Sequence, residues 1–349
     1  MPELISLAGI ALKTSLLIGA AGMLSIALRR QSAAFRHLLW TSTLALCGLM
    51  PLAVLYLPSF SLVTVPMDLS SSLPSPATGG GSGWDLLIWI IGCSIVLMRE
   101  LLASIGLARW RRQARPLTSA RWTATLARIS ATCSFDCSRV RVLESNHLAS
   151  PCMWGVLRPV LLLPAAGDAW PESARRSALL HELAHVRRRD TLSTLISRLA
   201  CALHWYNPLV WLAAARVRTL QERACDDSVI RSGAVPSEYA QFLVDVAAHT
   251  SGIGRAARAA IGMTHGSSLR TRIVAILDPE ATREQPQRSA VFAAYASLLG
   301  VMIFLATASV AAPPPPVPEP PILATPPTLP VPPVRPVPPT LPTPPVSPI

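Results

Sequence analysis

Residues 181–185 read His181-Glu182-Leu183-Ala184-His185 and form the pattern H-E-x-x-H. In a helix, residues that are four apart lie on one face, so both imidazoles can bind a single zinc ion. Glu182 then lies beside the metal, where it can accept a proton from a bound water. The stretch therefore predicts a catalytic centre with one zinc per chain, in which His181 and His185 are metal ligands and Glu182 is the general base.

A catalytic zinc needs a third protein ligand and keeps one position open for water. The metzincin spacing would place a histidine at position 191, which is a threonine, and an intramembrane protease would not follow the motif with three arginines. A downstream acid on another helix remains. Spacing leaves several choices open: Asp190, Glu222, Asp226, Asp227, Glu238 and Asp245.

Two of these acids, Glu222 and Asp226, lie four residues apart and hence on one helical face. Zinc chemistry favours Glu222 as the ligand and Asp226 as the residue that orients a ligand histidine from behind. A solvated acidic face is the alternative that the spacing does not exclude.

The composition indicates a membrane protein. Hydrophobic residue types make up 51% of the 349 residues and charged types only 14%, whereas soluble domains carry about a quarter charged residues. Four stretches are long and apolar enough to span a bilayer: 4–28, 37–57, 84–108 and 289–312. We therefore predict a mainly α membrane protein, with a three-helix membrane domain at residues 1–108, a domain at 109–288 and a fourth transmembrane helix. An ordinary cytosolic enzyme is excluded.

Basic residues set the expected orientation. The loop after the first stretch holds three arginines, the loop 58–83 holds no Lys or Arg, and the segment 109–288 holds 25 arginines against 14 acids. Positively charged loops stay in the cytoplasm. We expect a multi-pass protein of the cell (inner) membrane, with a cytoplasmic zinc domain and an extracytoplasmic N-terminus and tail. Lys13, inside the first stretch, is either a structural charge or part of signalling.

The segment 109–288 has an α+β pattern. We expect a helix to about Ala131, strands at Arg139–Leu143 and Pro159–Leu163, a helix that begins after Pro171, and another from Asn207-Pro208 to near Gly233. The apolar stretch 191–215 is interpreted as domain core that touches the bilayer, because Arg198, His204, Asn207 and Pro208 interrupt it. We also expect the strand residues Val160, Leu161 and Leu162 to pair with an extended substrate.

Partners follow from the charge. The arginines of 109–288 are scattered, adjoin a bilayer and show no recognition-helix pattern, so membrane lipid is the expected partner and direct binding of nucleic acid is not. Residues 313–349 hold 19 of the 34 prolines. This tail is predicted to be disordered and polyproline-like, serving as a spacer or as a docking segment for an envelope partner.

The sequence resembles the BlaR/MecR-type membrane metallopeptidases. The resemblance rests on the motif at 181–185, the stretch His204-Trp-Tyr-Asn-Pro-Leu-Val-Trp211, the pattern Glu222-x-x-Cys225-Asp226 and the spacing Ser150-Pro…Pro164. It implies a gluzincin domain at 109–288 with Glu222 as third ligand. It also implies a signal transducer whose protease inactivates a cytoplasmic, winged-helix repressor, often with self-cleavage in a loop such as 250–270. One departure is Leu220, where an acid commonly precedes the ligand Glu.

A second departure concerns the signal. Antibiotic sensors of this family carry a penicillin-binding domain with a Ser-x-x-Lys nucleophile, and the only lysine here, Lys13, lies elsewhere. We therefore do not expect β-lactam acylation as the input. The predicted reaction is peptide hydrolysis by a zinc metalloendopeptidase. The alternatives are a non-proteolytic scaffold or transducer, and an envelope quality-control protease.

Overall fold

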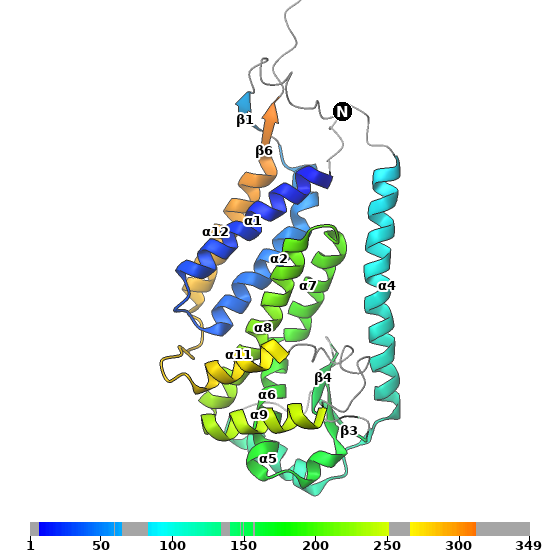
Figure 1. Ribbon diagram of the computed structural model, residues 1–349, viewed down its shortest axis with the longest axis vertical. Coiled ribbons are helices and arrows are strands. Elements are labelled where there is room, and N and C mark those ends of the chain that lie inside the picture. The colour runs from blue at the N-terminus through cyan, green and yellow to red at the C-terminus, as the bar shows by residue number, and fades with distance from the viewer. Residues whose placement is uncertain are drawn as a thin grey trace, which may run out of the picture.

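The computed structural model describes residues 7–58, 60–64, 83–133, 140–146, 148, 150–155, 158–250 and 266–311. Its helices confirm the mainly α prediction. Four of them are long and apolar enough to span a membrane (Figure 1): α1 (Leu7–Ala27), α2 (Ala33–Tyr56), α4 (Gly83–Gln113) and α12 (Arg288–Thr307). The proline-rich tail at 313–349 lies outside the described residues.

The observed ends differ from the expected ones in three places. Helix α4 continues to Gln113, five residues past the expected end at position 108. Helix α2 begins four residues before position 37 because Ser32 caps it, its side chain accepting a hydrogen bond from the Phe35 amide. Helix α12 ends at Thr307, and the next residues form strand β6 (Ala308–Ala311), which pairs in parallel with β1 (Phe60–Thr64). The two spans α2 and α12 are thus joined at the end of the bundle farthest from α6.

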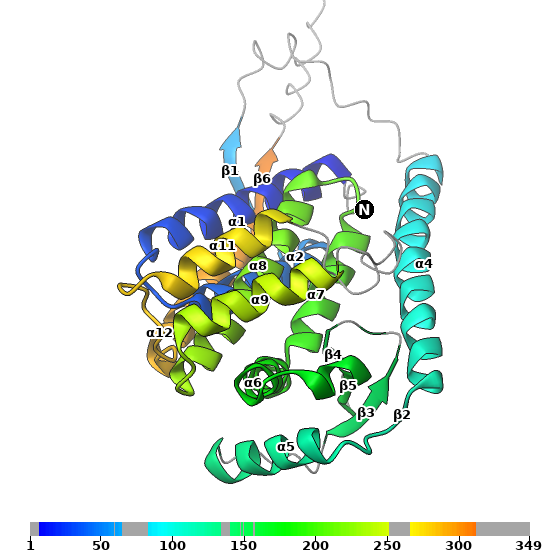
Figure 2. The same ribbon diagram turned by 60° about the horizontal axis from the view of Figure 1, so that its bottom comes forward.

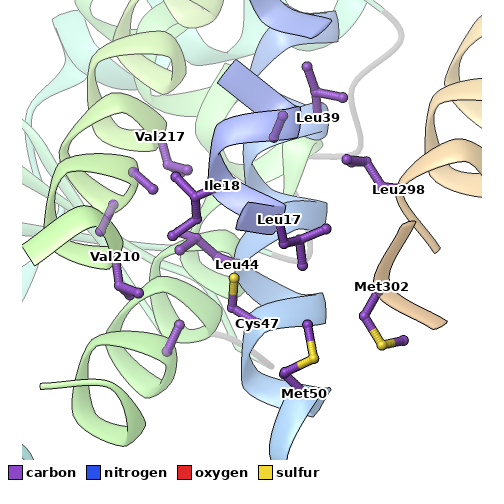
Figure 3. Close-up of a cluster of buried hydrophobic side chains, with 14 of the residues drawn as sticks. Leu17, Ile18, Leu39, Leu44, Cys47, Met50, Val210, Val217, Leu298 and Met302 are labelled. Atoms are coloured by element: carbon purple, nitrogen blue, oxygen red, sulfur yellow. The ribbon is translucent and has the colours of Figure 1, made fainter. Parts of the chain in front are cut away.

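Three spans and a helix of the central segment share one hydrophobic core. Figure 3 shows Leu17 of α1 and Leu44 of α2 between Val210 and Val217 of the central segment on one side and Leu298 of α12 on the other, and all of them belong to one buried cluster. Lys13 of α1 donates a hydrogen bond to the Ala306 carbonyl of α12 at 3.0 Å. This intramembrane charge therefore has a partner in the bundle, as burial of a charge requires.

Helices α7 (Asp190–Leu203) and α8 (Pro208–Arg231) form a hairpin that lies among the spans. The α8 start was expected correctly: the Asn207 side chain accepts a hydrogen bond from the Leu209 amide at 3.0 Å, and Pro208 occupies the first helical position. Both helices pack along α2 (Figure 1).

Helix α4 stands to one side of the bundle and is held mainly by the hairpin (Figures 1 and 2). Trp89 Nε1 donates to the Leu203 carbonyl at 2.9 Å, and Cys93 Sγ donates to the Ala202 carbonyl at 3.1 Å. Between them, a Cβ on Gly92 would lie 2.1 Å from the Trp205 ring. Only glycine permits this close approach of α4 to the hairpin.

The remaining elements form a small α+β unit at the end of the molecule away from strands β1 and β6 (Figure 2). Its sheet has the order β2 (Arg115–Pro116), β3 (Arg141–Ser145), β5 (Val160–Pro164), β4 (Cys152–Trp154), in which only β3 and β5 are parallel. The 3₁₀ helix η2 (Ala165–Ala169) leads into α6 (Glu172–Arg188). Helices α5 (Ala120–Cys133), α9 (Pro236–Thr250) and α11 (Gly266–Leu277) complete the unit. Of the segment 250–270, residues 251–265 lie outside the described part.

Strand β5 does not fit the substrate role expected for Val160, Leu161 and Leu162. Each of the three pairs with β3 on one side and with β4 on the other. All five β5 residues are buried, so the backbone offers no free edge to a peptide. The all-apolar run of β5 is typical of a central strand, and β4 lies at the end of the described sheet instead.

Candidate metal centre

Three side chains from two helices converge on one point. His181 and His185 lie one turn apart on α6, and Glu222 projects from α8. The two Nε2 atoms are 3.3 Å apart, and the Glu222 carboxylate lies 3.4 Å from His181 Nε2 and 3.8 Å from His185 Nε2. The two Nε2 atoms therefore face the Glu222 carboxylate. The spacing of the motif predicted that the two histidines share one helical face.

This donor set fits zinc. Two imidazoles and a carboxylate are the ligands of many catalytic zinc sites, and bonds of about 2.0–2.1 Å in tetrahedral geometry hold ligand atoms about 3.3 Å apart. The three potential ligand atoms all lie within 4.8 Å of one another, and the shortest separations match that spacing. His181, His185 and Glu222 can therefore hold a metal ion with little rearrangement.

A left-handed turn positions the partner of His185. Arg189, at φ 55°, ends α6 and precedes α7, so the chain reverses direction there. Asp190, the first residue of α7, is 1% exposed, and its Oδ2 lies 2.9 Å from His185 Nδ1. With a proton on Nδ1, the Nε2 lone pair of His185 is free to face the metal. Cys225 of α8 lies 3.3 Å from the same Nδ1.

His181 has an equivalent support from α8 and α9. Its Nδ1 lies 3.2 Å from Asp226 Oδ1 and 3.1 Å from the Tyr239 hydroxyl, which itself donates to Asp226 at 2.8 Å. Asp226 thus occupies the position behind a ligand histidine that the sequence suggested. Each histidine therefore has a buried carboxylate that fixes its ring orientation.

Arg272 of α11 carries a positive charge that pairs with the carboxylates of Asp226 and Glu222. Its Nε and Nη2 donate to both Asp226 oxygens at 2.8 and 2.7 Å, and Nη1 lies 3.1 Å from Glu222. Burial alone would raise the pKa of Glu222, but Arg272 and the His181 hydrogen bond lower it to about 2. Glu222 is therefore ionised, as a metal ligand must be.

In the metal-free site the same carboxylates favour a proton on His181. Burial lowers the pKa of His181, and the hydrogen bonds to Asp226 and Glu222 more than reverse this effect, raising it to about 10. A proton and a metal ion thus compete for this imidazole.

Glu182 lies on the same helix as the two histidines and is partly buried. Burial raises the pKa of its carboxyl group, while His185 and His181 lower it to a smaller extent. A carboxylate whose pKa moves toward neutrality is suited to accept and later release a proton at physiological pH.

The other acids considered from the sequence have different surroundings. Asp227 lies 3.7 Å from Arg283, Glu238 is exposed on α9, and Asp245 accepts a hydrogen bond from Gln241. Asp190 supports a histidine and does not complete the group of His181, His185 and Glu222. The sequence analysis did not identify Tyr239 or Arg272, which come from helices that carry no recognisable motif.

Glu222→Gln is expected to weaken zinc binding by at least tenfold, because an amide is a poorer, uncharged ligand and the site loses a negative charge facing two histidines. Metal content and zinc affinity measured on the purified protein in detergent test this. Glu238→Gln, the same chemical change at an exposed position, should bind zinc as wild type does. Equal affinity for both variants would remove Glu222 from the ligand set.

Comparison with known proteins gives one family and several relatives. A family model described as BlaR1 peptidase M56 matches residues 82–276, more than half of the chain. The regulatory protein BlaR1 of Bacillus licheniformis is 26% identical over 148 residues, which are 42% of this chain and 24% of that protein. The methicillin resistance mecR1 proteins of Staphylococcus aureus and Staphylococcus epidermidis are 20% identical over 171 residues, 48% of this chain and 28% of theirs.

These matches cover about a quarter of the length of the relatives. The family match at residues 82–276 includes the candidate metal centre, since it contains α6, α8, α9 and most of α11. Together with the four apolar helices, these matches support a multi-pass membrane protein.

Proposed function

The chain belongs to the BlaR1 peptidase M56 family, and from this premise we propose that it is an integral-membrane, zinc-dependent endopeptidase that transduces a signal by inactivating a cytoplasmic repressor. The observation that carries the proposal is the convergence of His181, His185 and Glu222 on one point, with Glu182 on the same helix turn. Relatives named as regulatory and resistance proteins support the signalling role.

The chemistry of the side chains follows from their positions. A bound zinc would lower the pKa of its water to about 7 and polarise the scissile carbonyl. Glu182 would accept a proton from the attacking water and pass it to the leaving amine. Asp190 and Asp226 keep the two imidazoles oriented, and Arg272 holds Glu222 in place through the contact at 3.1 Å.

We place the substrate along β4 rather than β5. Strand β4 is at the end of the described sheet, packs against α6 and is partly exposed. Burial raises the pKa of Cys152 on β4 to about 12, and the negative charge of Glu182 contributes, which indicates that the strand and the general base are close. An extended peptide paired with β4 would therefore pass beside Glu182.

We propose a cytoplasmic metal centre from the arginine bias of 109–288, membrane lipid as a partner, and a winged-helix repressor as the substrate. Self-cleavage within 250–270 and an envelope partner for the tail at 313–349 are further proposals of the same kind.

The test compares cells that express wild type with cells that express a His181→Ala, His185→Ala double variant, by mass spectrometry of new protein N-termini. The proposal expects a cleaved DNA-binding protein that appears only with wild type. Cleavage confined to membrane proteins would instead support a quality-control protease. Identical N-termini in both samples, from cells exposed to the signal that the protein transduces, would support a scaffold and contradict the peptidase.

A further inference from the structure

We propose that the α7–α8 hairpin, residues 190–231, is a re-entrant membrane element. It enters the bilayer from the side of the metal centre, turns at residues 204–207 beyond the midpoint of the spans and returns to the same side. Lipid acyl chains cover its apolar flank. The proposal rests on the four spans and on the packing of the hairpin, and it does not depend on peptidase activity.

Contacts with α1 and α2 set the depth of the turn. Asn207 Nδ2 donates to Thr14 Oγ1 at 3.2 Å and to Ser15 Oγ at 3.1 Å, both in the first half of α1, which begins at the end of the bundle away from α6. His204 Nε2 lies 2.9 Å from the carbonyl oxygen of Cys47. Cys47 is the fifteenth of the 24 residues of α2, which runs away from the metal centre.

Helix α4 gives the same depth independently. Its contacts with residues 202–205 come from Trp89, Gly92 and Cys93, all in the first half of its 31 residues. This half lies away from the metal centre (Figure 1). Three spans therefore place the turn past their own midpoints, so the hairpin cannot lie on the membrane surface.

The distribution of side chains on α7 is the reverse of that on a water-soluble helix. Its buried residues include the small Ser193, Ser197 and Ala200, whereas large apolar side chains face outward. A soluble helix buries its leucines, and membrane helices place small residues at their interfaces. The outward leucines of the hairpin are 37–65% exposed: Leu192, Leu195, Leu199, Leu209 and Leu212.

Lipid acyl chains are the occupant that this flank fits. The adjacent span α4 exposes large apolar side chains in the same way, among them Leu97 and Leu101. The hairpin and α4 are in contact, and both expose large apolar side chains. An apolar surface of this extent is rare in water, and the lipid that surrounds α4 would also reach the hairpin.

Arg198 and the backbone carbonyls near the turn have the partners that a membrane interior demands, whereas the buried Trp205 Nε1 has no hydrogen-bond partner among the described residues. Arg198 Nε lies 3.2 Å from the Glu100 carboxylate of α4. At the turn, the carbonyl oxygen of Trp205 accepts from Trp211 Nε1 at 3.1 Å. The carbonyls of residues 202 and 203 accept from α4, as described above. The residues that interrupt the apolar stretch are thus satisfied by neighbouring helices.

Helix α8 is unbroken from Pro208 to Arg231 and carries Glu222. Glu222 lies fifteen positions after Asn207, and at the helical rise of 1.5 Å per residue this is a distance of about 22 Å along the helix axis. One rigid helix therefore joins the contact with α1, deep among the spans, to a metal ligand.

Spin-label accessibility in proteoliposomes tests the proposal. Single cysteines replace Leu195 or Leu212 in a parent without its native cysteines, with Leu97→Cys as the lipid reference and Ser237→Cys, exposed on α9, as the aqueous reference. We expect the ratio of oxygen to nickel-chelate collision rates at 195 and 212 to match that at 97 and to exceed that at 237 several-fold. Ratios equal to that at 237 would overturn the proposal.

A second measurement covers the case in which the cysteine-free parent does not fold. A photoreactive diazirine amino acid is placed at 195, 212, 97 or 237 in the otherwise native chain, and the protein is irradiated in phosphatidylglycerol and phosphatidylethanolamine vesicles. Phospholipid adducts at 195 and 212, as at 97, support the re-entrant hairpin. Adducts at 97 alone contradict it.

Discussion

Glu182→Gln is expected to reduce peptide cleavage by about a hundred- to ten-thousand-fold, the usual contribution of a general base, while zinc remains bound. The reason is the division of roles on α6: His181 and His185 face Glu222, whereas Glu182 is not a member of that group of potential ligands. The amide preserves size and removes the proton acceptor. Cleavage of a peptide library by the purified protein, together with zinc content, measures both effects.

The matched control is Glu172→Gln, the same change in the first turn of the same helix. Glu172 is exposed and pairs with Arg128, and exposed pairs contribute little to stability. This variant should cleave at the wild-type rate. Undiminished cleavage by Glu182→Gln would assign the general base to another residue, and loss of zinc from it would show that Glu182 supports the metal rather than the reaction.

Local patterns predicted the parts of the site that depend on local geometry. The i, i+4 spacing of His181 and His185 determines that they share a face, and Asn207-Pro208 determines where α8 begins. The choice of Glu222 among six acids was not local, because it depends on how α8 packs against α6. The spacing left the choice of the third ligand open, and the resemblance to a family indicated Glu222.

The remainder depended on packing between helices that carry no motif. Tyr239 and Arg272 reach Asp226 only because α9 and α11 pack near α8. Strand β5 was predicted correctly as a strand, yet its neighbours, and hence its buried edges, come from sheet order. The apolar stretch at 191–215 contained Arg198 and His204, whose partners on α4 and α2 cannot be read from the stretch itself.

Asp226→Ala is expected to lower the free energy of unfolding by about 3–5 kcal/mol, the cost of removing one partner of a buried ion pair. Asp226 is 3% exposed at its side chain and accepts two hydrogen bonds from Arg272, which is itself only 15% exposed. The variant leaves Arg272 with Glu222 alone and removes the hydrogen-bond acceptor of Tyr239. Denaturant unfolding in detergent with a chelator present measures this loss apart from any loss of zinc.

The effect should depend on pH with a defined sign. Burial would raise the pKa of Asp226, but Arg272 and the hydrogen bond to His181 hold it well below its ordinary range. A group with a lowered native pKa stabilises the fold fully above its unfolded pKa, about 3.9 for aspartate, and loses that contribution as the pH falls toward the native value. The difference between wild type and Asp226→Asn should therefore shrink below about pH 4, where Asp226 gains a proton. It should also shrink as the pH rises from about 6.5 toward about 10, because His181 then loses the proton that Asp226 stabilises.

Two controls separate the ion pair from simple truncation. Glu238→Ala removes an exposed carboxylate and should change stability by less than about 0.5 kcal/mol. Asp226→Ala combined with Arg272→Met removes both partners of the ion pair, so the double variant should lose less stability than the sum of the two single variants, because the contact between the two residues is then lost only once. If the double variant loses the sum of the two single effects, the two residues do not stabilise the fold as a pair.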